Sequence, residues 1–133
     1  MKREQPPRRR AIVSALVTAQ VEVTVYDAAR RYPTELAARA GCLAALVEDL
    51  AVFVGSGDTK LVIEQDDSLV RADRQELYQL TRGAGIIDVL DYRHQRAHEE
   101  PLLALPDVAA WCWVRSGEWR RRIDPILAAV RTV

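Results

Sequence analysis

The chain has 133 residues, which suits one domain with a hydrophobic core, and its 49% hydrophobic and 29% charged residues are ordinary for a soluble globular protein. Nineteen basic and nineteen acidic residues cancel, so the net charge does not imply non-specific nucleic-acid binding, and only local patches such as the arginines at 8–10 and 120–122 are left as candidates for it. No apolar run approaches the roughly 20 residues that span a bilayer, and no signal-peptide core follows the charged residues 1–7. We therefore expect a cytoplasmic protein that does not enter the membrane, with Cys42 and Cys112 as buried free thiols.

The first half of the chain predicts two helices with a strand between them. Prolines at 6–7 suit the first turn of a helix, and apolar residues then recur at helical spacing over 12–17. Valines alternate with polar residues over 21–26, which predicts a strand. A long helical pattern covers 36–54, and the sequence Gly-Ser-Gly-Asp at 55–58 is expected to end it.

The second half continues the alternation of strands and helices. The apolar run Leu61 to Ile63, which ends at Glu64, suits a strand that is buried on both faces. The later elements that we expect are a helix at 71–82, a strand at 86–92, a polar loop with both histidines at 93–100, a helical segment within 99–113, a break at 116–117 and a last helix at 119–130.

This order of elements predicts the α/β class. Helices that alternate with strands imply a parallel sheet, so we expect a single domain over 1–133 with about three parallel strands flanked by helices. Such a sheet is small, and only one helix precedes the strand at 21–26. The sequence therefore predicts a chain that begins one helix into a larger α/β domain.

Asp107 is a carboxylate within the mostly apolar stretch 99–113. If this stretch packs on a sheet, Asp107 must be paired, bound to a metal ion, or held at a helix start where the dipole stabilises it. Pro106 precedes it, which favours the helix start. Leu103 and Trp111, four residues to either side, would instead turn Asp107 toward the sheet.

Three segments carry a family resemblance. Residues 60–67 contain an apolar strand that ends in acids. Residues 92–111 contain a group of apolar residues and then Asp107, in a helix rich in small residues. Residues 1–4 are charged and lead into an arginine-rich helix. Together they resemble the C-terminal part of a bacterial family, domain of unknown function 3800, whose members look ribonuclease H-like. That family opens with a strand carrying an Asp-Glu-Ser-Gly motif. This sequence contains no such motif, so the resemblance implies an N-terminally incomplete site.

The resemblance implies a metal-dependent nuclease, with Glu64 and Asp107 as metal ligands and Glu4 as a third catalytic carboxylate. Two-metal phosphodiester hydrolysis uses several carboxylates around ions about 4 Å apart, and Mg²⁺ or Mn²⁺ prefers such oxygen ligands. The resemblance also implies nucleic acid as the partner. Because the first-strand aspartate is missing, we expect little or no activity from this chain alone.

Each candidate residue also has a structural interpretation. Glu64 can be the first solvated residue after a buried strand, Asp107 a first-turn acid, and Glu4 a terminal charge in solvent. His94 and His98 are a metal pair only if their loop is helical and a third ligand lies near. The arginine runs at 8–10 and 120–122 are either solvated faces or phosphate-binding groups, and the tryptophans are expected in the core.

A second hypothesis assigns the chain to a different functional class. An unprotected strand edge pairs readily with another strand. Residues 21–26 would then complete the sheet by homodimerisation or by docking a partner protein, and the chain would be a non-catalytic interaction module.

Overall fold

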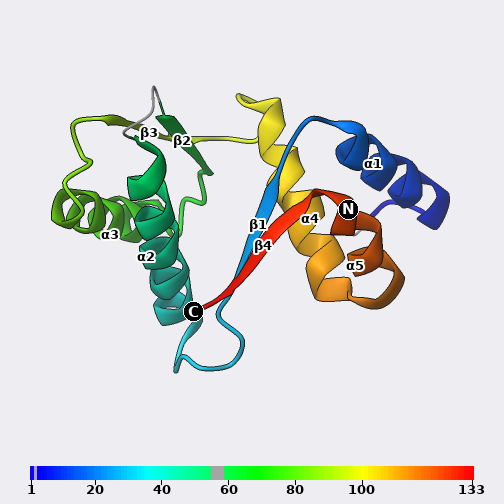
Figure 1. Ribbon diagram of the computed structural model, residues 1–133, viewed down its shortest axis with the longest axis horizontal. Helices are drawn as coiled ribbons and strands as arrows, with labels where there is room; N and C mark the ends of the chain where they lie inside the picture. Colours follow the sequence, from blue (N-terminus) through cyan, green and yellow to red (C-terminus); the bar gives the residue numbers. More distant parts are fainter. Residues whose placement is uncertain (2, 55–58) are drawn as a thin grey trace. The chain divides into compact units, whose positions relative to one another are not determined.

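The computed structural model describes residues 1, 3–54 and 59–133 and confirms the α/β class (Figure 1). Residues 55–58, expected to end the second helix, lie outside the described residues. Within the described residues, no helix is long and apolar enough to cross a membrane. The elements are α1 (Pro6–Thr18), β1 (Val23–Asp27), α2 (Glu35–Phe53), β2 (Thr59–Glu64), α3 (Val70–Gly83), β3 (Leu90–Gln95), the 3-10 turn η2 (Pro101–Leu103), α4 (Ala104–Arg115), α5 (Gly117–Ile123), the 3-10 turn η3 (Asp124–Ile126) and β4 (Leu127–Thr132).

The strands form two sheets of two strands, not the single sheet of three that the sequence predicted. β2 and β3 pair in parallel, from Thr59 opposite Leu90 to Glu64 opposite Gln95. β1 pairs with β4, and the two arrows point the same way in Figure 1. The prediction was wrong because the partner of β1 comes from the C-terminal segment, which the sequence pattern assigned to a helix.

The helix expected at 119–130 ends early. α5 stops at Ile123, and Pro125 lies in the following turn η3. Proline lacks the backbone N–H that a continuing helix needs, so the chain leaves the helical conformation there. Residues 127–132 are extended instead and bond to β1. Their alanines favour a helix locally, but pairing with β1 decides the outcome.

The third strand lies later in the sequence than expected. Residues 86–89 form a turn, in which the amides of Val89 and Leu90 both donate to the Ile86 carbonyl at 3.1 Å. β3 follows at Leu90–Gln95, so the polar loop expected from residue 93 was wrong over its first three residues. The pattern was missed because His94, although polar, has a fully buried side chain.

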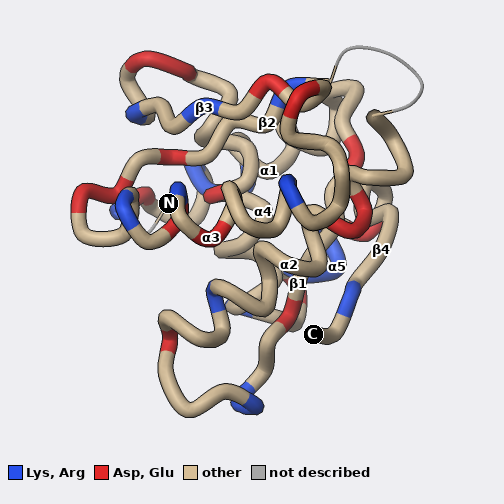
Figure 2. Tube along the Cα trace, turned by 90° about the vertical axis from the view of Figure 1, so that its left-hand side faces the viewer, with Lys and Arg blue, Asp and Glu red and all other residues tan. Residues whose placement is uncertain are grey.

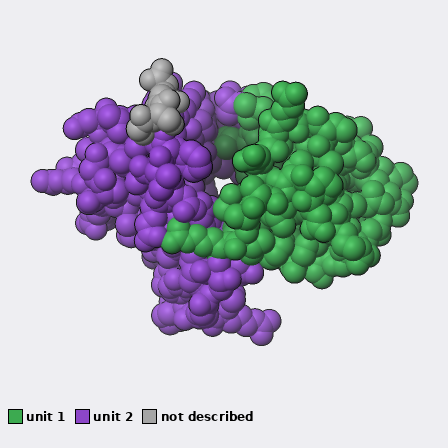
Figure 3. Space-filling model, in the orientation of Figure 1, with its two compact units in different colours: residues 1–25, 101–131 green, residues 26–100, 132–133 purple. Residues whose placement is uncertain are grey.

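The chain folds as two compact units (Figure 3). Unit 1 comprises residues 1–25 and 101–131, and unit 2 comprises residues 26–100 and 132–133. Each unit has a hydrophobic core of its own. The core of unit 1 contains Val13, Leu16, Val108, Ala109, Cys112, Ile123 and Ile126. The core of unit 2 contains Leu43, Val47, Leu77, Ile86 and Leu90.

Both cysteines are free thiols, as predicted. Cys112 is fully buried in the core of unit 1, whereas Cys42 on α2 is only partly buried. Burial is the main cause that raises the pKa of each thiol above its usual value. Both cysteines are therefore protonated at neutral pH and are poor nucleophiles.

Candidate functional site

Unit 1 brings two of the three predicted acids to one place. Glu4, which precedes α1, and Asp107, near the start of α4, line the same surface hollow together with Met1, Arg3 and Trp111. We call this feature the Glu4–Asp107 hollow. Both acids are exposed, so a cation in the hollow would meet carboxylate oxygens from two distant parts of the sequence.

Local structure explains how α4 contributes to the hollow. Asp107 lies in the first turn of α4, where the helix dipole stabilises a negative charge by about 0.3–1 kcal/mol. The helix-start interpretation of Asp107 therefore describes its position. Trp111 follows one turn later on the same side of the helix and also lines the hollow. Because the Asp107 carboxylate is exposed, it needs no partner within the protein and is accessible to a cation from solution.

The donor set of the hollow suits one hydrated divalent ion. Mg²⁺ usually keeps several waters and binds proteins through one or two carboxylates. No hydrogen bond or ion pair is recorded for either carboxylate in the part of the chain that the structure describes, whereas Arg3 lines the same hollow and opposes a cation. Among the described residues, no three His, Cys, Asp or Glu side chains gather to hold a metal. The hollow therefore fits weak binding of a single ion.

Glu64, the third predicted acid, belongs to unit 2. It is the last residue of β2, lies opposite Gln95 and is exposed. Asp66 follows in a solvated turn, where its Oδ1 accepts from the Ser68 hydroxyl at 2.6 Å and the Ser68 amide at 2.9 Å. These two bonds are the main causes that lower the pKa of Asp66. Glu64 thus ends a parallel strand, the place where α/β sheets carry ligands.

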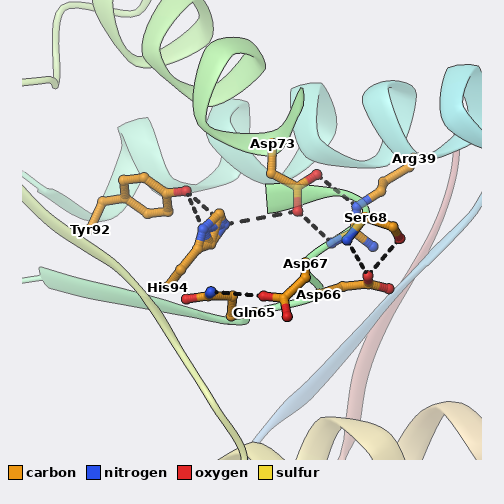
Figure 4. Close-up of polar contacts among 8 residues, drawn as sticks. All are labelled: Arg39, Gln65, Asp66, Asp67, Ser68, Asp73, Tyr92 and His94. Carbon is orange, nitrogen blue, oxygen red and sulfur yellow. Dashed lines mark hydrogen bonds and ion pairs between the residues drawn. The ribbon is translucent and has the colours of Figure 1, made fainter. Parts of the chain in front are cut away.

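Sequence reasoning missed a buried polar network in unit 2 (Figure 4). Asp73 on α3 is only 2% exposed and accepts two bonds from Arg39 on α2. Arg39 Nε lies 2.8 Å from Oδ1, and Nη2 lies 2.7 Å from Oδ2. The bond to Asp73 is the main cause that raises the pKa of Arg39. This paired geometry ties the two helices together.

β3 joins the network through His94 and Tyr92. The buried His94 ring places Nε2 3.8 Å from Asp73 Oδ2, and the Tyr92 hydroxyl lies 2.8 Å from the same Nε2. Burial, followed by the charge of Asp73, raises the pKa of Tyr92 to about 12. Its hydroxyl is therefore protonated at neutral pH, and both oxygens of Asp73 are occupied by Arg39. The arrangement joins two helices to a strand.

One sequence signal pointed toward this network. Asp73, Leu77 and Thr81 recur at four-residue spacing, and all three are buried on one face of α3. A carboxylate on the apolar face of a helix requires a partner, although the sequence does not say which one. His94 and His98 do not share an element. His94 belongs to β3 and its side chain is buried in the network, whereas His98 follows β3 and is exposed.

The burial of His94 predicts a loss of stability in acid. Burial, aided by the charge of Arg74, lowers the pKa of His94, while Asp73 opposes this shift and Arg39 adds to it. The unfolded chain, with a histidine pKa near 6.5, binds the proton more readily than the folded chain. The stability contributed by neutral His94 is therefore present above roughly pH 6.5 and declines as the pH falls toward the folded-state pKa. Urea unfolding across this range measures the effect.

Two variants identify the histidine that is responsible. His94→Gln should flatten the decline in unfolding free energy between neutral and mildly acidic pH. His98→Gln removes an exposed histidine and should leave the pH dependence of the native chain unchanged. An equal change in both variants would argue against His94.

Comparison with known proteins gives no match. No family model, curated protein or solved structure matches this chain.

Proposed function

We propose that the Glu4–Asp107 hollow binds a divalent cation, Mg²⁺ or Mn²⁺, and that the chain is related to ribonuclease H-like, metal-dependent nucleases. One observation carries the proposal. Glu4 and Asp107, which lie far apart in the sequence and were chosen by the resemblance to domain of unknown function 3800, line one hollow of unit 1.

The residues of the hollow would have two roles, to hold a cation and to contact a phosphate group. A bound divalent ion would supply Lewis-acid stabilisation of a phosphoryl oxygen. Glu4 and Asp107 would hold this ion, and Arg3, which lines the same hollow, would donate to a phosphate oxygen. Two carboxylates are fewer than a two-metal centre uses, so cation binding is the main expectation and hydrolysis by this chain alone should be slow.

Removing the two carboxylates should abolish cation binding. Paramagnetic Mn²⁺ in the hollow would broaden the indole N–H resonance of Trp111, because that residue also lines it. We expect wild-type protein to show this broadening at lower Mn²⁺ concentration than Glu4→Gln or Asp107→Asn, and the double variant to lose it. Excess Mg²⁺ should reverse the broadening, because both ions prefer the same oxygen ligands.

A matched control is available in the same unit. Glu22 is exposed and does not line the hollow, so Glu22→Gln removes one charge without touching the candidate ligands. Broadening that weakens equally in Glu22→Gln would contradict a specific site. The same titration on Glu64→Gln tests whether Glu64 contributes as the resemblance implies. Cleavage of RNA, DNA or hybrid substrates that survives both Glu64→Ala and Asp107→Ala would exclude the proposed catalytic residues.

The open sheet edges support the second candidate, a module that pairs strands with a partner. In the part of the chain that the structure describes, each strand is paired with one other strand only. Each sheet therefore offers main-chain groups to a further strand. Sedimentation equilibrium measures the result. Self-association through the sheets would give a dimer, and a strict monomer at all concentrations would argue against homodimerisation.

A further inference from the structure

The charges of the chain are divided unequally between its two units (Figure 2 marks them along the chain). The sequence of unit 1 contains ten basic and five acidic residues, whereas that of unit 2 contains nine basic and fourteen acidic residues. The net charge of zero therefore conceals a basic unit and an acidic unit. The balanced net charge of the whole chain gives no reason to expect nucleic-acid binding, but unit 1 by itself is positively charged and can attract it.

Several arginines of unit 1 stack on tryptophan rings. Trp111 on α4 and Trp119 on α5 pack edge to face, with ring centroids 5.0 Å apart. Arg9 and Arg115 lie over Trp111, at 4.9 and 5.5 Å from its centroid, and Arg122 lies over Trp119 at 5.7 Å. We call these five residues, contributed by α1, α4 and α5, the arginine–tryptophan face.

The arginine–tryptophan face is held in place and remains partly open. Stacking orients a guanidinium group through its flat face and leaves the donors at its edge for acceptors in the ring plane. One edge donor of Arg9 is already used, because its Nε donates to the Met1 carbonyl at 3.1 Å. Arg115 is exposed, and the structure records neither a hydrogen bond nor an ion pair for it among the described residues. Arg122 donates to Glu118 at 2.7 Å, and the same carboxylate lies 3.8 Å from Arg10, so one acid serves two arginines. Glu4 and Asp107 of the hollow beside Trp111 add two negative charges, and Arg3 of the same hollow adds a positive one. The local charge is still positive, because Arg3, Arg9, Arg10, Arg115 and Arg122 outnumber these three acids.

We propose that the arginine–tryptophan face binds the phosphate backbone of single-stranded nucleic acid. Trp111 belongs both to this face and to the Glu4–Asp107 hollow, so a strand on the face would run beside the candidate cation site. The inference rests on the proposed function where it names nucleic acid as the substrate, but binding to the face requires no metal ion.

The tryptophans favour a single strand over a duplex. Trp111 and Trp119 are partly buried and pack against the core of unit 1, so each residue keeps some accessible surface beside the arginines that stack on it. Exposed aromatic surface between arginines stacks on unpaired bases, which a duplex keeps inside its helix. An acidic protein offers carboxylates to the arginines but offers no bases to the rings.

Removing two face arginines should weaken binding and reduce its salt dependence. We would measure the anisotropy of labelled oligouridylate and oligothymidylate in EDTA over a range of NaCl concentrations, for wild type and Arg9→Gln/Arg115→Gln. Each lost phosphate contact lowers the slope of log affinity against log salt by about 0.7 for a single strand. We therefore expect the slope to fall by about 1.4 and the affinity to fall by about tenfold or more at low salt.

The control variant removes the same charge from unit 2. Arg30 and Arg31 are exposed in the segment after β1, so Arg30→Gln/Arg31→Gln should leave both affinity and slope unchanged. Equal weakening by this control would overturn the proposal, and so would a labelled duplex or polyglutamate that competes as well as the single strand. Circular dichroism confirms that each variant is folded before binding is compared.

The cation site is tested separately from the arginine–tryptophan face. Glu4→Gln/Asp107→Asn should lose the Mn²⁺ effect and retain oligonucleotide binding in EDTA. Loss of strand binding in Arg9→Gln/Arg115→Gln with Mn²⁺ broadening intact would support the face. Wild-type protein that binds Mn²⁺ but no oligonucleotide would refute the face and leave the cation site standing.

Discussion

Replacing Asp73 with alanine is expected to lower the unfolding free energy of unit 2 by about 3 kcal/mol, because removing one partner of a buried ion pair leaves the charge of the other without compensation. Asp73 is 2% exposed and receives both bonds of Arg39. The Arg39 side chain is 35% exposed and can regain some water, which places the cost at the lower end of the usual range. The nearby His94 would lose its acidic neighbour as well.

Hydrogen exchange resolved along the sequence measures this loss where it occurs. In Asp73→Ala, amides of α2 and α3 should exchange faster, because the network joins these helices. The double variant Arg39→Met/Asp73→Leu replaces the pair with apolar groups and should recover much of the loss. Unchanged exchange in Asp73→Ala, or a double variant weaker than the single one, would contradict this account of the network.

The sequence was informative where local pattern and burial agree. The start of α1 at Pro6–Pro7 and the inward face of α3 at Leu77 followed from helical preferences that the folded chain retains. β4 was missed because its Leu-Ala-Ala-Val residues favour a helix locally, and only pairing with the distant β1 holds them in a strand. β3 was misplaced because the burial of His94 depends on partners that no local pattern reveals.

The candidate site shows the same division between local and distant information. Asp107 could be placed near a helix start from Pro106 alone. Its association with Glu4 came from a resemblance between motifs, because no local pattern relates residues so far apart in the sequence. The pairing of Asp73 with Arg39, 34 residues apart, had no sequence signal beyond a charge on an apolar face. Composition gave the total charge but could not show which segments share a unit.

The core of unit 1 supports the arginine–tryptophan face, so a cavity in that core should affect both stability and binding. Ile123 at the end of α5 is 0% exposed and packs in the cluster that includes Cys112 and Val13. Ile123→Ala removes buried methyl and methylene groups and should lower the unfolding free energy of unit 1 by about 3 kcal/mol. Because α5 also carries Trp119 and Arg122, the face should loosen with it.

Tryptophan emission reports on this unit specifically, since Trp111, Trp113 and Trp119 all belong to unit 1. In Ile123→Ala, the urea midpoint of tryptophan emission should fall, and oligonucleotide affinity should fall with it once the unit begins to open. Val114→Ala, at a side chain that is 81% exposed, should change the unfolding free energy by about 0.5 kcal/mol or less. If Ile123→Ala behaves like Val114→Ala, then α5 is not anchored by this core. If the midpoint falls while binding persists through the transition, then the oligonucleotide does not depend on the ordered face.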